Sequence, residues 1–246
     1  MKLLISFLIL LLSINVHAIS KKYYAHKVQY RTFFGSCPSK AVGRLALTLM
    51  KEFEKENSLL SVKKKIVDDK LIDKYFLSSY KVNYSPAKKM IKFHFECPKP
   101  LLKVQIYKEN GDEFYTAILV DSGELLDPTY EVLLRSEKKL SKELPHLALP
   151  AEKMNANYHK EIASLLNKLG PKFENRISEI ILNDKAELTI ILSVGRKPSS
   201  AFLGTDFWDE KATKLQKIVE YMSTKNSIPS VINLTNSKKA VVKFKK

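Results

Sequence analysis

The chain has 246 residues, enough for one or two domains with a substantial buried core. Hydrophobic residues make up 45% of it, which excludes an intrinsically disordered protein. The formal net charge of +16 predicts a polyanion nearby, whether nucleic acid, anionic lipid or an acidic envelope polymer.

The N-terminal segment distinguishes between these polyanions. After Met1-Lys2, the run from Leu3 to Leu12 is almost wholly Leu, Ile and Phe, and Val16-His17-Ala18 fits a small-residue cleavage site. We interpret residues 1–20 as a signal peptide or signal anchor, so no nucleic-acid partner is expected. The uncharged run is just long enough to span a bilayer, but Lys21-Lys22 opposes the positive-inside bias. Two locations therefore remain open: a single-pass inner-membrane protein with its bulk in the periplasm, or a periplasmic protein if the leader is cleaved.

Residues 28–98 predict a compact βααββ domain. A strand from Val28 to Phe33 precedes the first helix. A second helix is expected from about Asp68 to Leu77, because its first turn would be acidic, as the helix dipole favours. Two strands split by Ser85-Pro86 follow, and the second alternates apolar and polar residues. The expected buried stripe of the first helix is Val42, Leu45, Ala46, Leu49, Met50 and Phe53.

Both cysteines of the chain lie in this domain. Cys37 precedes the first helix and Cys97 follows the last strand, so the two could meet as a disulfide in an oxidising compartment. Two unpaired, buried thiols fit the sequence equally well, because a bridge requires Cα atoms within about 7 Å of each other.

Residues 101–246 predict a second, strand-rich domain. Asn110-Gly111 between alternating apolar residues indicates a β-hairpin. A helix is expected from Met154 to Leu169, and Gly170-Pro171 should end it. The proline pair in Cys97-Pro98-Lys99-Pro100 marks the boundary between the two domains.

The last sixty or so residues are the most informative part of the chain. A strand from Glu187 to Val194 precedes a helix in which Lys211, Lys214 and Lys217 are expected to face away from the core. A final strand, Ala240 to Phe244, should lie at an open sheet edge, and open edges accept other chains. The expected apolar stripe of the helix is Trp208, Ala212, Leu215, Val219 and Met222.

This C-terminal block resembles the distal β-domain of the FtsQ/DivIB family of bacterial cell-division proteins. The resemblance rests on Ala201-Phe202-Leu203-Gly204, the lysine-bearing helix, and the closing Ile232-Asn233-Leu234 and Val241-Val242-Lys243-Phe244 segments. Leu119 to Leu125 and Glu143 to Leu147 match further family motifs in the right order. The first domain is similar to a polypeptide-transport-associated (POTRA) domain, which such proteins carry before the β-domain.

The resemblance implies a non-enzymatic scaffold of the cell envelope that recruits FtsL-like and FtsB/DivIC-like partners for septum formation. Recruitment would proceed by β-strand addition to the closing strand. The residues expected to bind the partner are Asn236, Ser237, Lys238, Lys239, Ala240, Val241, Val242 and Phe244. The alternative is a POTRA-containing envelope protein for polypeptide transport or outer-membrane assembly.

Catalytic signatures are missing from the sequence. None of the five histidines has the spacing of a helical metal pair, and we expect each at the surface. Only seven glycines are present, and no phosphate-cradling loop is found among them. The helical spacing of Trp208 favours a core position over a ligand-stacking platform. The acidic pairs Asp68-Asp69 and Asp209-Glu210 are explained by helix dipoles. We therefore predict no catalytic residue, metal, cofactor or small-molecule substrate.

The lysine clusters have two interpretations. Lys63-Lys64-Lys65 is typical of a solvated surface. So is the second cluster, Lys238-Lys239 with Lys243, Lys245 and Lys246, but it is expected on the closing strand. Lysine at a sheet edge guards against random strand pairing, and it also steers an acidic partner. The two roles are compatible.

Overall fold

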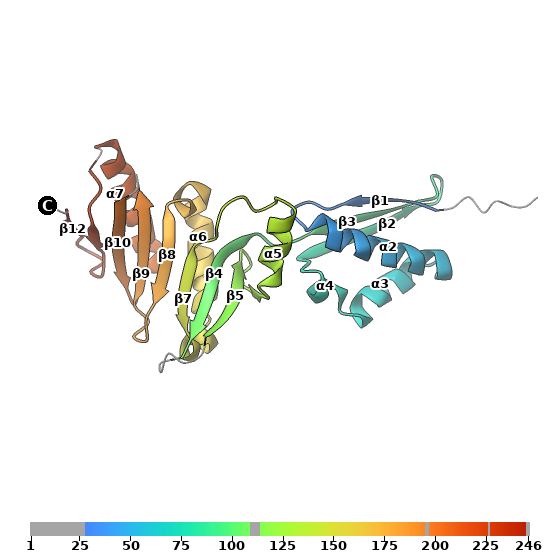
Figure 1. Cartoon of the computed structure of the whole chain (residues 1–246), viewed down its shortest axis with the longest axis horizontal. Helices are drawn as coiled ribbons and strands as arrows, with labels where there is room; N and C mark the ends of the chain where they lie inside the picture. The colour runs from blue at the N-terminus through green and yellow to red at the C-terminus, as the bar shows by residue number, and fades with distance from the viewer. Residues whose placement is uncertain (1–27, 109–113, 195–196, 226, 245–246) are drawn as a thin grey trace, which may run out of the picture.

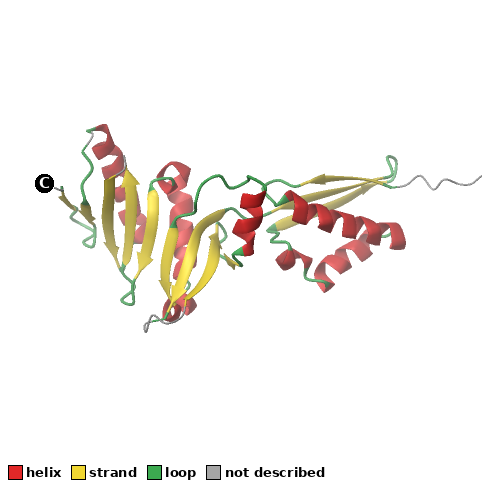
Figure 2. Cartoon of the chain, in the orientation of Figure 1, coloured by secondary structure: helices red, strands yellow, loops and turns green. Residues whose placement is uncertain are grey.

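The computed structural model describes residues 28–108, 114–194, 197–225 and 227–244. It confirms the predicted α+β fold, with two separate sheets, each accompanied by helices (Figures 1 and 2). The leader over residues 1–20 and the Asn110-Gly111 turn lie outside the described residues. No helix within the described ranges combines the length and apolar composition that a bilayer crossing requires.

The first module, residues 28–98, has a three-stranded sheet in the order β1-β3-β2. β1 runs parallel to β3, and β2 runs antiparallel to it. Three helices lie between β1 and β2 in the sequence, one more than the predicted βααββ order has. The elements are β1 (Gln29–Phe33), α2 (Ser39–Glu56), α3 (Leu59–Asp68), α4 (Leu71–Lys74), β2 (Ser79–Ser85) and β3 (Met90–Glu96).

The predicted apolar stripe of α2 is confirmed, because all six of its residues are buried. Only the short α4 (Leu71–Lys74) lies in the range predicted for the second helix, about Asp68 to Leu77. The longer α3, which begins at Leu59 and ends at Asp68, was not predicted, and no acidic residue lies in its first turn. The start is set by Ser58, whose hydroxyl accepts the backbone N–H groups of Leu60 and Ser61. The Asp68-Asp69 pair thus lies at a helix C-terminus, where Asp69 pairs with Lys65 at 3.0 Å.

The second module has one nine-stranded sheet in the order β12-β11-β10-β9-β8-β7-β4-β5-β6. Helices α6 and α7 pack on one of its faces (Figure 1) and bury the main core. Its elements are β4 (Pro100–Tyr107), β5 (Phe114–Val120), β6 (Leu125–Leu126), α5 (Thr129–Ser136), β7 (His146–Pro150), the 3-10 helix η2 (Ala151–Ala156), α6 (Tyr158–Glu174), β8 (Ile177–Leu182), β9 (Leu188–Val194), β10 (Lys197–Gly204), α7 (Trp208–Thr224), β11 (Val231–Asn233) and β12 (Val241–Lys243).

The helix predicted from Met154 to Leu169 is displaced toward the C-terminus. Residues 151–156 form the 3-10 helix, so α6 begins only at Tyr158. Gly170 breaks the helix with φ 72° and ψ 172°, a conformation that favours glycine, but one more turn follows from Pro171 to Glu174. The break was expected at this place and the extra turn was not.

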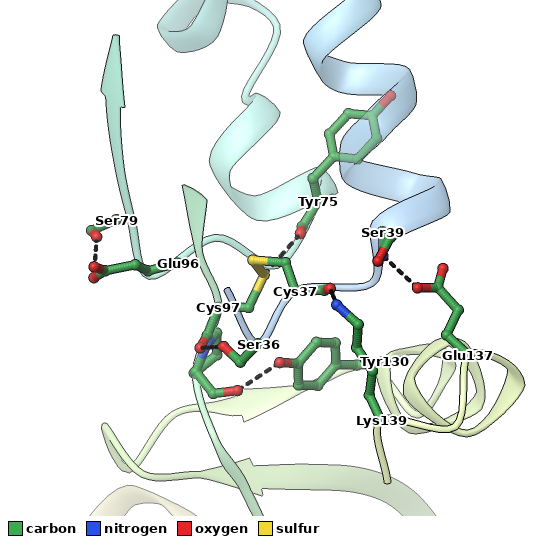
Figure 3. The surroundings of a disulfide bond; sticks show 11 residues. Ser36, Cys37, Ser39, Tyr75, Ser79, Glu96, Cys97, Tyr130, Glu137 and Lys139 are labelled. Atoms are coloured by element: carbon green, nitrogen blue, oxygen red, sulfur yellow. Dashed lines mark hydrogen bonds between the residues drawn. A yellow bond between two sulfur atoms is a disulfide. The ribbon is translucent and has the colours of Figure 1, made fainter. Parts of the chain in front are cut away.

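The two modules are packed against each other at a junction between α5, with the residues just after it, and the segments that hold Cys37 and Cys97. Cys37 and Cys97 form a disulfide, with their Cα atoms 4.9 Å apart, so the structure has the first of the two alternatives that the sequence left open. Tyr130 and Leu134 of α5 belong to the same buried cluster as both cysteines. We define the junction as Tyr130, Glu137 and Lys139 of the second module together with Ser36 to Lys40 and Cys97-Pro98 of the first (Figure 3).

Candidate partner-binding edge

β12 is the outermost strand of the nine-stranded sheet, at the end opposite β6. It pairs antiparallel with β11, and Val242 lies opposite Ile232. No described strand pairs with its other side, so the sheet ends there in backbone groups available for hydrogen bonding. The predicted strand from Ala240 to Phe244 is too long, because β11 supplies only three pairing positions.

The hydrogen bonds of Lys243 show which backbone groups face the open side. Its carbonyl accepts the Ser230 N–H at 2.9 Å and the Ser230 hydroxyl at 3.0 Å, so the backbone groups of Lys243 point toward β11. Backbone groups of successive strand residues point to opposite sides. The N–H and C=O of Val242 therefore point away from β11, toward the open side of β12, where an added strand could hydrogen-bond to them.

The platform beneath β12 is rigidly built. β11 runs parallel to β10, and α7 connects them across the face of the sheet. Ile232 and Leu234 are at most 1% exposed, and the Leu234 N–H donates to the Phe202 carbonyl at 2.8 Å. An added strand would extend an ordered sheet rather than order a loose segment, which lowers the entropic cost of binding.

Lys211 is not on the outer face of α7, which corrects the expectation from the sequence. Its side chain is 1% exposed, and the ammonium donates to the Leu203 carbonyl at 2.8 Å and to the Asp206 carboxylate at 2.5 Å. Spacing could have revealed this, since Lys211 lies three residues after Trp208 and four before Leu215, on the buried stripe. Lys211 thus fixes the turn between β10 and α7.

The core position predicted for Trp208 is confirmed. Its indole is buried, and Nε1–H donates to the Gly204 carbonyl at 2.7 Å. Gly204 has φ 74°, and a Cβ there would lie 3.5 Å from Thr235 after β11. The turn from Gly204 to Trp208 therefore links α7 to the segment that leads into β12.

The segment between β11 and β12 is held by side-chain hydrogen bonds. The Asn233 side chain accepts the Thr235 N–H at 2.9 Å, and that of Asn236 accepts the Lys238 N–H at 2.8 Å. Lys214 of α7 donates its ammonium to the Ser237 carbonyl. These bonds return the chain from β11 to β12 without a long loop.

The residues predicted to bind a partner lie in this one region of the sheet. Five of them form the turn before β12, two lie in β12, and Phe244 follows it. Val241 and Phe244 are 62% and 45% exposed, while Val242 is half-buried against the main core. The eight residues are Asn236, Ser237, Lys238, Lys239, Ala240, Val241, Val242 and Phe244.

The open face of the sheet beside β12 carries exposed apolar side chains. Phe202 lies opposite Asn233, and Asn233 lies opposite Val241, so the three residues form one row across the strands. Phe202 is 38% exposed and Val241 is 62% exposed. A partner that added a strand to β12 would cover these side chains as well.

The charge around β12 is positive. Lys238, Lys239 and Lys243 are exposed, and none of them forms an ion pair with a described carboxylate. Free ammonium groups at a sheet edge repel basic strands and attract acidic ones. The edge is thus complementary to an extended segment that combines apolar and acidic residues.

Within the described ranges, no group of three or more His, Cys, Asp and Glu side chains is arranged to hold a metal ion. The expectation of surface histidines is wrong for His159, which is 8% exposed and whose Nδ1 has no partner among the described atoms. Burial and then the neighbouring Lys160 lower its pKa, which favours the neutral imidazole. His94 and His146 are exposed, and His17 and His26 lie outside the described residues.

Comparison with protein-family models and with curated proteins finds no match for this chain. The resemblance to the FtsQ/DivIB family therefore stays a prediction from motif order, and β12 is a candidate binding edge because of its geometry alone.

Proposed function

We propose that this protein is a non-enzymatic scaffold of the cell envelope that binds a partner by strand addition to β12. In the FtsQ/DivIB-like interpretation, the partners are FtsL-like and FtsB/DivIC-like division proteins at the septum. The observation that carries the proposal is the open side of β12, where the backbone groups of Val242 face away from the sheet. An edge strand supplies affinity through main-chain bonds, and the flanking lysines supply selectivity.

The first test removes the edge while keeping the platform. A chain that ends at Ser237 lacks β12 but retains β11 and the helix α7 beneath it. Ile232 and Leu234, which anchor β11 in the core, are also kept. We expect this truncation to abolish copurification with an FtsB-like partner while the far-ultraviolet circular dichroism spectrum stays nearly unchanged. Undiminished copurification would remove β12 from consideration.

The second test concerns the place of action. A fluorescent fusion of the full chain should concentrate at mid-cell in dividing cells, and the truncated chain should keep that position only if another surface directs it there. A uniform peripheral signal would instead favour the alternative, a POTRA-containing protein of transport or assembly. The observation that supports this alternative is the separate three-stranded sheet of the first module.

A further inference from the structure

One face of the three-stranded sheet in the first module is open to solvent. Helices α2, α3 and α4 lie on the other side of the strands (Figure 1), where Ile91, Phe93 and Phe95 of β3 are 0% exposed. Successive side chains of a strand point to opposite faces, so Lys92 and His94 point away from the helices. Both of these side chains are exposed, which shows that this face of the sheet is in contact with solvent.

The open face carries basic side chains in adjoining positions. Arg31 of β1 lies opposite Lys92 of β3, and in the next row Lys81 of β2 lies opposite His94. Neighbouring strands are about 4.8 Å apart, so these side chains can contact one ligand together. None of Arg31, Lys81 and Lys92 forms an ion pair with a carboxylate of the described residues.

The opposed cations Arg31 and Lys92 are unfavourable in the free protein, because like charges directly opposite each other on neighbouring strands are destabilising. Glu96, the single acidic residue of the three strands, does not offset them. Its carboxylate accepts the Ser79 hydroxyl at 2.7 Å and lies 3.7 Å from the Nε2 atom of His94. An anion bound between Arg31 and Lys92 removes the repulsion, so this pair favours a negatively charged ligand.

An aromatic ring lies next to the basic pair. Phe33 is 39% exposed, and its ring centroid is 5.7 Å from that of His94, which lies opposite it on β3. The Arg31 guanidinium carbon is 4.9 Å from the centre of the Phe33 ring, a cation–π contact that holds both groups in place. A fixed, exposed ring with a negative face attracts the C–H groups of a ring-shaped ligand that stacks on it.

Uncharged hydrogen-bonding side chains complete the open face. Asn83 lies opposite Lys92, and Gln29 and Ser85 lie on either side of Met90 in the preceding row. Amide and hydroxyl groups both donate and accept hydrogen bonds, as the hydroxyl groups of a sugar do. The face thus combines cations, a stacking ring and neutral polar groups.

We propose that this open face binds a linear glycan that carries carboxylates, an acidic polymer of the kind that the net charge of +16 predicts. The Arg31 guanidinium binds a carboxylate through paired N–H donors, and the Lys92 and Lys81 ammonium groups bind it as point charges. Phe33 stacks against a sugar ring, and the neighbouring amides bond to sugar hydroxyls. This surface belongs to a different sheet from β12, and the inference holds whether or not β12 binds a partner.

Two other polyanions fit the open face less well. A bilayer surface is bound by basic side chains together with several apolar side chains that insert into it, and Phe33 is the one large apolar side chain that these strands expose on this face. Single-stranded nucleic acid is bound by stacking of successive bases on several aromatic rings, and the sequence of residues 1–20 predicts export. Both polyanions therefore serve as comparison ligands in the test.

The test measures, by calorimetry, the affinity of the full chain for a short oligogalacturonate, in which every sugar carries a carboxylate. The salt concentration is about 0.15 M, which screens exposed charges more than about 8 Å apart. The double variant Arg31→Gln, Lys92→Gln should bind about tenfold or more weakly, because two charge-assisted contacts are lost. Its thermal stability should not fall, since the substitutions also remove the repulsion between the opposed cations.

The matched control is the double variant Lys63→Gln, Lys64→Gln, which removes the same charge from exposed positions of α3. Its affinity should stay within about twofold of that of the unmodified chain. Phe33→Leu keeps an apolar side chain but removes the ring, and should weaken binding about threefold. A neutral malto-oligosaccharide of the same length should bind the unmodified chain at least about tenfold more weakly than the oligogalacturonate, because it offers no carboxylate to the cations.

Three results would overturn the proposal. Equal affinities of the two double variants would show that net charge alone attracts the polymer, without a site on this face. Tighter binding of a single-stranded oligonucleotide or of phosphatidylglycerol vesicles than of the oligogalacturonate would overturn the assignment to a glycan. Absence of measurable binding of the oligogalacturonate to the unmodified chain would overturn both the site and its ligand.

Discussion

Replacing Lys211 with methionine tests whether the turn that supports the binding edge depends on one buried ammonium. Methionine preserves most of the aliphatic stem but removes both hydrogen bonds, to the Leu203 carbonyl and to Asp206. Asp206 is 59% exposed, so water can solvate its carboxylate and this part of the loss is small. The Leu203 carbonyl is buried, and leaving such a group unsatisfied costs about 1–3 kcal/mol.

We therefore expect Lys211→Met to lower the free energy of unfolding by about 2 kcal/mol, which lowers Tm by roughly 4–8 °C for a protein of this size. The chain has a single tryptophan, and Trp208 bonds to Gly204 within the same turn, so its fluorescence reports unfolding there. Lys217→Met, on the exposed face of α7, is the matched control and should change stability by less than about 0.5 kcal/mol. Equal stability of the two variants would refute the assigned role of Lys211.

Three further perturbations test other parts of the fold. Gly123→Ala should destabilise the chain by about 2 kcal/mol in urea unfolding, because φ is +81° there and the new Cβ would lie 3.0 Å from the Lys160 Cα. Burial opposes ionisation of Glu137, but the N–H bonds at the α2 N-terminus outweigh it and hold the pKa below the ordinary 4.5. The stability difference between the unmodified chain and Glu137→Gln, about 1 kcal/mol at neutral pH, should therefore persist above pH 4.5 and vanish as the pH falls through the lowered pKa. Loss of the disulfide in the double variant Cys37→Ser, Cys97→Ser should cost about 4 kcal/mol of unfolding free energy, from the loop of 60 positions that it closes; a loss below about 1 kcal/mol would contradict that estimate.

Regular periodicity made much of the fold predictable. The alternation of Ile91, Phe93 and Phe95 predicted one buried face, and all three are 0% exposed. The stripe of α2 and the core position of Trp208 follow from helical spacing in the same way. These elements are specified by neighbours within one or two turns of the chain, which a sequence pattern records.

The errors arose where a single residue or a distant contact decides the structure. Ser58 starts α3 through its hydroxyl, whereas the acidic pair Asp68-Asp69 predicted a helix that begins only at Asp68. Lys211 was assigned to the surface because of its charge, whereas local acceptors satisfy its ammonium within the core. Glu137 caps α2 from 98 residues away, and no local pattern encodes such a contact.

The open edge itself could be anticipated, but its exact length could not. The apolar run Ala240-Val241-Val242 predicts a closing strand, and the sheet order places β12 at the edge. The strand shortens to Val241–Lys243 because its partner β11 is equally short, a property set by the turn at Asn233 and Asn236. Pairing length depends on both strands, and the sequence of one strand does not determine it.

The central claim is that the Val242 backbone accepts a partner strand, and one proline tests it most directly. Val242→Pro removes the N–H that points to the open side, while the inward bonds of Lys243 to Ser230 remain. The control is Val242→Ile, which keeps the backbone N–H and a β-branched apolar side chain at the same position. In a copurification titration with an FtsB-like partner, we expect Val242→Pro to weaken binding at least about tenfold and Val242→Ile to leave it nearly unchanged. Full binding by the Val242→Pro chain would contradict strand addition at this edge.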